Sequence, residues 1–354
     1  MDKKVIVGMS GGVDSSVAAA LVKQQGYTVT GVTMRIWPRE PATGKGRHGC
    51  YGPEEEQDIE DAKRIAQKLH VPLHVIDLAE AYRAEVLDYF CSEYLAGRTP
   101  NPCVRCNRRI KFGALLDRAA SMGLEFDYFA TGHYARLEKD EKSGRQLLRR
   151  GKDSRKDQSY FLYNLTQGQL SRSLFPLGNY MKAEVKQICR EMGLGVEEKQ
   201  ESQNFVCGDY SSLFSKPLEA GPIVDKKSRV LGHHRGIVFY TVGQRHGLRI
   251  GSRQPLFVTA IDAEKNAIVA GPKEDLYVME QKVRDLNWIA VESLKGSREV
   301  RARVRSTHQG YKAVISALAC GVNVVYSEPQ IGAAPGQAIV FYDGDVVLGG
   351  GIAC

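Results

Sequence analysis

Residues 5–16 read VIVGMSGGVDSS, a short apolar run that meets a Gly/Ser turn, and a helical pattern follows over residues 17–21. This order predicts a strand, a tight loop and a helix N-terminus, whose free backbone N–H groups point outward and carry partial positive charge. Such a terminus binds phosphate, and Gly11 and Gly12 let the backbone approach an anion closely. No Gly-Lys-Ser/Thr sequence follows, so the loop is not of the Walker type.

The same loop has a more specific parallel. Residues 10–15 (SGGVDS) resemble the pyrophosphatase loop of the N-type ATP pyrophosphatases, which cleave ATP between the α and β phosphates and adenylate a substrate. The alternative is a plain Ser N-cap followed by a Gly turn. Asp14 either holds Mg²⁺ together with ATP oxygens or complements the helix dipole from the first turn.

Strand and helix patterns alternate along the first part of the chain. Apolar segments at residues 5–9, 28–34, 72–77 and 127–132 predict strands, and residues 15–25, 53–69, 80–95 and 182–192 predict helices. The alternation predicts a doubly wound, parallel α/β sheet, in which ligands bind at the carboxyl ends of the strands. The phosphate loop, Met34 and residues 131–133 (TGH) all fall at such ends.

The pattern changes near residue 208. Residues 221–273 are Gly-rich with short apolar runs, and strand and turn patterns continue from there to the end. Short runs with a tight turn at Asp343-Gly344 predict a small C-terminal β-barrel, with strands near residues 299–304, 313–316, 322–326, 338–342 and 346–348. We therefore expect a catalytic α/β domain over residues 1–208, a central β-rich domain over 209–273 and a barrel over 274–354.

The charge balance is basic. The formal net charge is +8, and basic residues cluster at 145–156 and 298–305. Such clusters indicate a polyanionic partner such as nucleic acid, with a solvated protein face as the alternative. No long apolar run exists and residues 1–4 lead straight into the first strand, so we expect no membrane span, no cleaved signal peptide and a cytoplasmic location.

Eight cysteines in such a chain do not predict a disulfide framework. Cys103 and Cys106 lie in a stretch with two prolines, residues 97–107 (GRTPNPCVRCN), which predicts a rigid loop rather than a helix interior. Cations follow at residues 108–111 (RRIK), and a thiol beside cations has a lowered pKa. Cys207 lies in a later polar loop, whereas Cys50 lies in a Gly-rich loop without an evident partner.

Cys103, Cys106 and Cys207 have four interpretations. A zinc site needs four ligands, and no second Cys-x-x-Cys or His pair is visible in the sequence. A redox pair, either Cys106 with Cys207 or Cys103 with Cys106, would serve persulfide transfer. Three thiolates on one iron–sulfur cluster would leave one iron open to carry an extra sulfur atom. Three unrelated thiols would carry no chemistry.

Seven motifs together are similar to the bacterial tRNA-specific 2-thiouridylase (MnmA/TrmU) family, and the match runs end to end. They are residues 10–16 (SGGVDSS), 97–112 (GRTPNPCVRCNRRIKF), 131–135 (TGHYA), 156–161 (KDQSYF), 241–245 (TVGQR), 285–288 (DLNW) and 335–338 (PGQA). The resemblance implies an adenine nucleotide α-hydrolase-like fold and sulfur insertion at C2 of the wobble uridine of tRNA. ATP would activate O2 as an adenylate, and sulfur from sulfide or a persulfide-carrying protein would then displace AMP.

The resemblance also implies residue roles. The nucleotide would contact Gly8, Met9, Ser10, Gly11, Gly12, Val13, Asp14, Ser15, Met34 and Gly132. Cys106 matches the nucleophile and Cys207 the partner that carries a persulfide. The residues that match tRNA contacts are Asn101, Pro102, His133, Lys156, Asp157, Gln158, Arg303, Arg305 and Gln337. His133 would orient a substrate group, with a loop-capping histidine as the alternative.

Three positions depart from the usual family pattern. Cys103 stands where the best-known members have an Asp, which makes a three-cysteine ligand set available. We therefore hypothesise that Cys103, Cys106 and Cys207 bind a [4Fe–4S] cluster whose fourth iron takes sulfide; the alternative is a persulfide relay from Cys207 to Cys106. Gly208 follows Cys207 where Phe is more usual, and Val304 separates Arg303 and Arg305 where an aromatic residue is common.

Two functions of other classes compete with this one. An adenylating amidotransferase would use the same loop but would need neither paired cysteines nor a C-terminal barrel. A basic RNA-binding protein with a vestigial nucleotide loop would release no pyrophosphate in the presence of tRNA.

Overall fold

The computed structural model describes residues 3–37, 49–200, 204–206, 210–215 and 217–354, which form two compact units. The first unit comprises residues 1–86, 103–209 and 345–347, and the second comprises residues 87–102, 210–344 and 348–354. Within the described ranges, no helix is both long and apolar enough to cross a membrane. Each unit has its own core and is described separately below.

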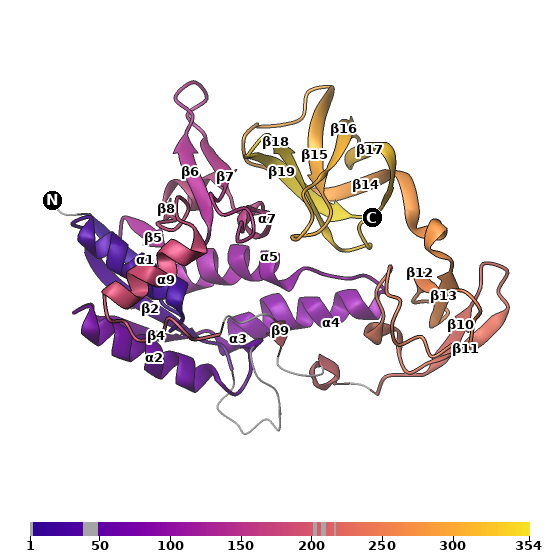
Figure 1. The fold of residues 1–354 in the computed structure, drawn as a ribbon, viewed down its shortest axis with the longest axis horizontal. Coiled ribbons are helices and arrows are strands. Elements are labelled where there is room, and N and C mark those ends of the chain that lie inside the picture. The colour runs from indigo at the N-terminus through magenta and orange to yellow at the C-terminus, as the bar shows by residue number, and fades with distance from the viewer. Residues whose placement is uncertain (1–2, 38–48, 201–203, 207–209, 216) are drawn as a thin grey trace. The chain divides into compact units, whose positions relative to one another are not determined.

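A five-stranded parallel sheet forms the centre of the first unit (Figure 1). Its strands, in spatial order, are β4 (Leu73–Asp77), β2 (Thr28–Arg35), β1 (Lys4–Gly8), β5 (Tyr128–Ala130) and β8 (Ser173–Leu174). From β1 the chain adds β2 and β4 on one side and later adds β5 and β8 on the other side. The order in which strands are added therefore reverses between β1 and β5, at the carboxyl end of β1. Ligands of doubly wound sheets bind at such points.

Helices cover both faces of this sheet. Val5 and Val7 of β1 point to one face, where they share a core with α1 (Val13–Gln24), α2 (Glu55–Lys68) and α9 (Lys182–Glu191). Phe129 of β5 points to the other face and meets Phe112 with their ring centroids 5.1 Å apart. The predicted doubly wound α/β fold is therefore confirmed.

The segment that carries Cys103 and Cys106 is helical, so the predicted loop is wrong. Helix α5 (Pro102–Cys106) continues into the π-helix η2 (Asn107–Ala114) and then α6 (Leu115–Ser121). Pro102 takes the first helical position, where the missing N–H group costs nothing and the fixed φ favours the helix. The three-residue spacing then places both cysteines on one face of α5.

A π-helical segment also interrupts the helix that precedes this one in the chain. The helix predicted over residues 80–95 consists of α3 (Ala79–Tyr82), the π-helix η1 (Arg83–Leu87) and α4 (Asp88–Leu95). The smaller elements of the first unit are β3 (Gly49–Tyr51), β6 (Ala135–Lys139), β7 (Gln146–Arg150), α7 (Ser159–Leu162), α8 (Gln167–Ser171) and β9 (Asn204–Val206).

A small mixed sheet and a barrel make up most of the second unit. The sheet has the order β11 (Val230–His234), β10 (Gly221–Val224), β13 (Ala267–Gly271) and β12 (Phe257–Asp262), with short helices η3 (Tyr210–Leu213), η4 (Ile237–Phe239) and η5 (Lys273–Leu276) beside it in sequence. The barrel strands are β14 (Tyr277–Trp288), β15 (Ser297–Arg303), β16 (Tyr311–Leu318), β17 (Gly321–Ile331), β18 (Ala338–Asp343) and β19 (Val346–Ala353).

The barrel closes because β14 pairs with both β17 and β19. The predicted β-rich region and small barrel are confirmed, including the turn between β18 and β19 at Gly344, whose φ is +59°. Strand β14 was not predicted because its sequence, YVMEQKVRDLNW, mixes charged and apolar residues without strict alternation. The division into three domains at residues 208/209 and 273/274 stays a prediction.

The core of the first unit generates a stability prediction. Ile65 of α2 is fully buried against the sheet, so we expect Ile65→Ala to lower the free energy of unfolding by about 2–5 kcal/mol. Lys63→Ala, on the exposed side of the same helix, should change it by less than about 0.5 kcal/mol. Urea unfolding followed by circular dichroism measures both values, and equal effects of the two substitutions would contradict the assigned core.

Candidate functional site

The loop after β1 is shaped by close packing of backbone. Gly11 has a φ of +70°, and a Cβ there would lie 2.3 Å from the carbonyl oxygen of Asp58, so only glycine fits. The hydroxyl of Ser15 accepts a hydrogen bond from the backbone N–H of Ser10 at 3.1 Å and donates to the carbonyl of Gly12 at 3.2 Å. Helix α1 therefore starts directly at the loop, as the sequence predicts for an anion-binding terminus.

The predicted nucleotide-binding residues lie along this terminus and the neighbouring strand ends. Gly8 ends β1, Met34 is the second-last residue of β2, and Gly132 follows β5. The side chains of Met9, Val13 and Ser15 are buried, so these residues offer an anion their backbone groups rather than their side chains. Their binding roles stay predictions.

Asp14 is part of a charge cluster that includes two residues the sequence analysis missed. Its Oδ1 accepts a hydrogen bond from the Tyr134 hydroxyl at 2.7 Å and from the Lys182 ammonium at 2.7 Å. Lys182 opens α9, and its side chain is only 12% exposed. Lys182 lies 168 residues from Asp14 in sequence, so no local motif indicates their contact. Tyr134 lies in the TGHYA motif, but the sequence assigned it no role.

The loop after β5 packs directly on the first turn of α1. A Cβ on Gly132 would lie 2.7 Å from the carbonyl carbon of Asp14 and 2.8 Å from the backbone nitrogen of Ser15. His133 is buried next to it, and its Nδ1 shares a hydrogen bond of 2.8 Å with the Thr131 hydroxyl. Burial, together with the charge of Lys111, lowers the pKa of His133 well below its usual value. His133 is therefore neutral at physiological pH.

The cysteine helix is joined to the neighbouring π-helix by an ion pair. Arg105 donates from Nε to the carbonyl oxygen of Glu85 at 3.0 Å and from Nη2 to its carboxylate at 2.7 Å. Arg109 lies 3.7 Å from the same carboxylate, and Arg108 hydrogen-bonds to Asn164. Arg108 and Arg109, two of the three cations that follow the cysteines in sequence, are thus paired with other groups.

The expected lowering of the thiol pKa values is wrong. Desolvation by neighbouring protein atoms raises the pKa of Cys106, which is half-buried, to about 12, and that of Cys103, whose surface is exposed, to about 11; the charge of Lys111 lowers both pKa values. Desolvation is the largest cause, and Glu85, which pairs with both Arg105 and Arg109, offsets part of the positive charge near the sulfurs. Both thiols are therefore protonated at neutral pH until a partner stabilises the thiolate.

The third cysteine, Cys207, lies outside the described residues. The other seven cysteines form no disulfide. In the described part of the chain, no group of three or more His, Cys, Asp or Glu side chains is arranged to hold a metal ion. The described residues thus bring together Cys103 and Cys106 on one helix face, and the three-cysteine ligand set stays a hypothesis.

The predicted tRNA-contacting motif at residues 156–158 is largely turned inward. Asp157 is buried and accepts hydrogen bonds from the backbone N–H groups of Gly151 at 3.2 Å and Ser159 at 3.0 Å. Gln158 accepts from the backbone N–H of Tyr134 at 2.9 Å, and Lys156 is half-buried. Two of these three side chains therefore hold the loop in place, and a contact with RNA stays a prediction.

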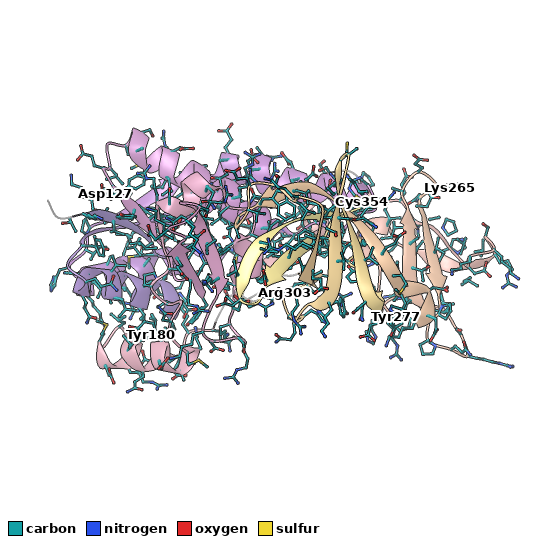
Figure 2. The ribbon with its side chains drawn as sticks, turned by 90° about the horizontal axis from the view of Figure 1, so that it is seen from above. Asp127, Tyr180, Lys265, Tyr277, Arg303 and Cys354 are labelled. Atoms are coloured by element: carbon teal, nitrogen blue, oxygen red, sulfur yellow. The ribbon has the colours of Figure 1, made fainter. Side chains whose placement is uncertain are left out.

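In the second unit, Arg303 and Arg305 have different surroundings. Arg303, labelled in Figure 2, is buried at the end of β15, where its guanidinium hydrogen-bonds to the carbonyl of Ser306 and lies 5.4 Å from the centre of the Tyr342 ring. Arg305 is exposed. Arg303 thus holds its own loop, and of these two predicted tRNA contacts Arg305 is the one whose charge faces solvent.

The remaining predicted tRNA contacts lie near the end of residues 87–102. Asn101 and Pro102 are half-buried, as is Gln337, whose side-chain amide donates to the carbonyl oxygen of Pro100 at 3.4 Å. The basic clusters are also partly neutralised: Arg149 pairs with Asp345 at 2.6 Å and Arg298 with Asp343 at 2.7 Å. The solvated-face interpretation therefore accounts for part of the basic charge.

Comparison with family models divides nearly the whole chain into three matches. Residues 3–207 match a model described as the tRNA methyl transferase HUP domain. Residues 215–272 match the tRNA methyl transferase PRC-barrel domain, and residues 278–353 match the aminomethyltransferase beta-barrel domain.

Curated relatives match over almost their full lengths. The tRNA-specific 2-thiouridylase MnmA of Moorella thermoacetica is 47% identical over 98% of both chains. The proteins of the same name from Endomicrobium trichonymphae and Heliobacterium modesticaldum are each 46% identical over 99% of this chain, and over 99% and 92% of their own.

Likeness to solved structures is weaker. A 4-thiouridine synthetase–RNA complex with bound ATP is 19% identical over 57% of this chain and 44% of its own, with a TM-score of 0.37, which supports no conclusion about this chain. The full-length identities to the curated relatives, by contrast, are decisive. The chain belongs to the tRNA-specific 2-thiouridylase (MnmA/TrmU) family.

Proposed function

We propose that the protein inserts sulfur at C2 of the wobble uridine of tRNA in an ATP-dependent reaction. The uridine O2 attacks the α-phosphorus of ATP, the bond to the β-phosphate oxygen breaks, and pyrophosphate leaves. A sulfur nucleophile then attacks C2, and the C2–O2 bond breaks so that AMP departs with the former O2. The partners are tRNA and a sulfur donor, either sulfide or a protein that carries a persulfide.

One observation carries this proposal: the loop after β5 packs on the first turn of α1, and the ring of its His133 lies 6.2 Å from that of Phe112 in η2, which continues the cysteine helix α5. Gly132 packs on the first turn of α1, and His133 follows Gly132 in the chain. The charge of Lys111 acts on His133 and also on the thiols of Cys103 and Cys106. This arrangement supports a reaction in which the predicted phosphate loop activates an oxygen and the predicted thiols supply sulfur to the same substrate, because such a reaction needs both groups close together.

The activating part follows from charge and backbone geometry. Free N–H groups at the start of α1 can bind the phosphates, and glycine at positions 11 and 12 leaves room for their close approach. Lys182 supplies a fixed cation at this terminus through its hydrogen bond to Asp14. A cation held there would stabilise the negative charge that develops on the transferring phosphoryl group.

Mg²⁺ fits this site only in part. One oxygen of Asp14 already accepts from Lys182 and Tyr134, and a cation that bound the same oxygen would be repelled by the ammonium. Asp14 could thus offer Mg²⁺ its second oxygen alone. We therefore assign Mg²⁺, when bound, mainly to the oxygens of ATP, where it would neutralise phosphate charge.

The sulfur-carrying part involves Cys103 and Cys106. Their side chains lie on one face of α5, a spacing that suits two neighbouring ligands, and a third thiolate would have to come from Cys207. A [4Fe–4S] cluster with one iron not held by the protein would carry the sulfur atom. Ligation would also remove the thiol protons that burial retains, since metal-bound thiols are deprotonated.

The domain assignment is part of the same proposal. Residues 1–208 would perform the chemistry, residues 209–273 would form a central β-rich domain, and residues 274–354 would bind tRNA through the barrel. Support for the last assignment comes from the exposed Arg305, two residues after the end of β15, because phosphate contacts from Arg position a protein on nucleic acid.

Removal of the Lys182 charge tests the activating part. We expect Lys182→Met to lower tRNA-dependent release of pyrophosphate by about 10²-fold, because it removes a cation from the site where charge develops. Lys186→Met, one turn further along α9, is the matched control and should leave the rate within about two-fold. Release of pyrophosphate by Lys182→Met at the wild-type rate would contradict the assigned role.

Replacement of Cys106 tests the reaction as a whole. In a strain that lacks the gene, the wild-type protein and Cys320→Ser, an exposed cysteine of the second unit, should restore 2-thiouridine in tRNA. Cys106→Ser should not, although the purified variant should still release pyrophosphate with tRNA, since activation precedes sulfur transfer. Mass spectrometry of tRNA nucleosides measures the outcome, and restored thiolation by Cys106→Ser would contradict the proposal.

Metal analysis decides how sulfur is carried. After anaerobic purification we expect bound iron and acid-labile sulfide, and we expect Cys103→Ser to lose both together with most of the thiolation activity. A fully active protein without iron would exclude the cluster. Near-normal activity of Cys103→Ser would instead support a persulfide relay from Cys207 to Cys106.

A further inference from the structure

A buried tyrosine lies where the elements that bear cysteines meet. Tyr82 is the last residue of α3, which follows the carboxyl end of β4, and its side chain is 1% exposed. On one side its ring stacks on Tyr51 of β3, with centroids 5.6 Å apart and planes at 13°. It also meets Phe205 of β9 at 6.5 Å. These distances are within the range of favourable aromatic pairs.

The two strands that Tyr82 contacts each lead to a cysteine. Strands β3 and β9 pair in parallel, with Gly49 opposite Asn204 and Tyr51 opposite Val206. Cys50 is the central residue of β3, and Cys207 directly follows β9 in the sequence. Tyr82 thus packs against the strand pair at the level of Cys50.

Tyr82 is also tied to the helix that bears the other two cysteines. Three residues after it, Glu85 of η1 forms the ion pair and the backbone hydrogen bond with Arg105. Arg105 stands between Cys103 and Cys106 in α5. Ring contacts therefore connect Tyr82 to β3 and β9, and the ion pair of Glu85 connects η1, which follows Tyr82 in the chain, to α5.

The thiol of Cys50 lies within electrostatic range of this helix. After desolvation, the Cys50 thiol is a further cause of the raised pKa values of Cys103 and Cys106, and all three thiols contribute to the raised pKa of the Tyr82 hydroxyl. Cys50 is itself exposed, so a thiol reagent can reach it. Cys50 has no evident partner in the sequence because the thiols of Cys103 and Cys106 lie more than fifty positions away from it.

From these contacts we propose that Tyr82 is a positioning residue of the sulfur-transfer site, and that Cys50 is a further thiol of that site. The ring of Tyr82 holds the β3–β9 pair beside the cysteine helix, which keeps Cys50 near Cys103 and Cys106. The inference rests on the proposed function for its catalytic meaning. The placement of the thiols, however, can be tested without tRNA.

Cross-linking tests the placement. A short bis-maleimide applied to the full-length protein should link Cys50 to Cys103 or Cys106, as identified by mass spectrometry of peptides. Tyr82→Phe keeps the ring and should keep the link, whereas Tyr82→Leu should reduce it several-fold. The link between Cys103 and Cys106 within α5 is the internal control and should form in both variants. Two results would overturn the proposal. Either both Tyr82→Phe and Tyr82→Leu lose the cross-link of Cys50, or both variants keep it.

Steady-state thiolation tests the catalytic consequence. Tyr82→Leu should lower kcat by about ten- to hundred-fold, because small misplacements of reacting groups have effects of this size. The KM for tRNA and the release of pyrophosphate should stay close to wild type. Tyr128→Leu, at the amino end of β5, controls for the loss of an aromatic side chain elsewhere in the unit and should retain kcat. A change confined to KM would overturn the positioning role.

Two further comparisons keep the outcome clear. If Tyr82→Leu does not fold, Phe205→Leu removes one of the two ring contacts and should reduce the Cys50 link in the same direction; an unchanged link would overturn the proposal. If the wild-type protein forms the link but thiolates no tRNA with any sulfur source, the proposed function fails while the placement of Cys50 stands.

Discussion

The contact between Gly132 and the first turn of α1 is the constraint on which the candidate site depends. A Cβ at this position would overlap the backbone of Asp14 and Ser15, so the loop after β5 can approach the helix terminus only with glycine there. Strand β5 pairs with β1, and the contact keeps the loop after β5, with the buried His133, close to the carboxyl end of β1. Because Phe112 on the cysteine-bearing helix packs on Phe129 of β5, one strand connects the anion-binding loop with the thiols.

Charge compensation then determines the resting state of the site. Asp14 pairs with Lys182, and Glu85 pairs with Arg105 and Arg109, so ion pairs offset part of the charge in both halves of the candidate site. Desolvation keeps His133 uncharged and keeps the thiols of Cys103 and Cys106 protonated. In the proposed reaction, the thiols would therefore be weak nucleophiles before substrates bind. Activation must come from what binds, either the charge of a nucleotide at the helix terminus or a species that stabilises the thiolates.

The order of strands and helices, the phosphate loop and the barrel could be predicted from the sequence because each depends on local periodicity and turn residues. The helical state of residues 102–106 could not, since two prolines and a short Cys-x-x-Cys stretch are typical of loops, and only tertiary packing shows Pro102 at a helix start. The roles of Lys182, Tyr82 and Cys50 could not be predicted from the sequence for another reason. Their importance comes from contacts with residues far away in the sequence, such as Asp14 and Phe205, and periodicity does not report such contacts. The raised thiol pKa values were missed because burial, not the neighbouring cations, dominates them.

The central claim is that the loop at the start of α1 activates the same uridine oxygen that sulfur later replaces. The direct measurement uses tRNA whose wobble uridine carries oxygen-18 at O2, with ATP, a sulfur source and the purified protein. The account predicts that thiolation transfers the labelled oxygen to the phosphate of AMP, with one labelled AMP for each 2-thiouridine formed. Unlabelled AMP, or label released into water while 2-thiouridine accumulates, would contradict it.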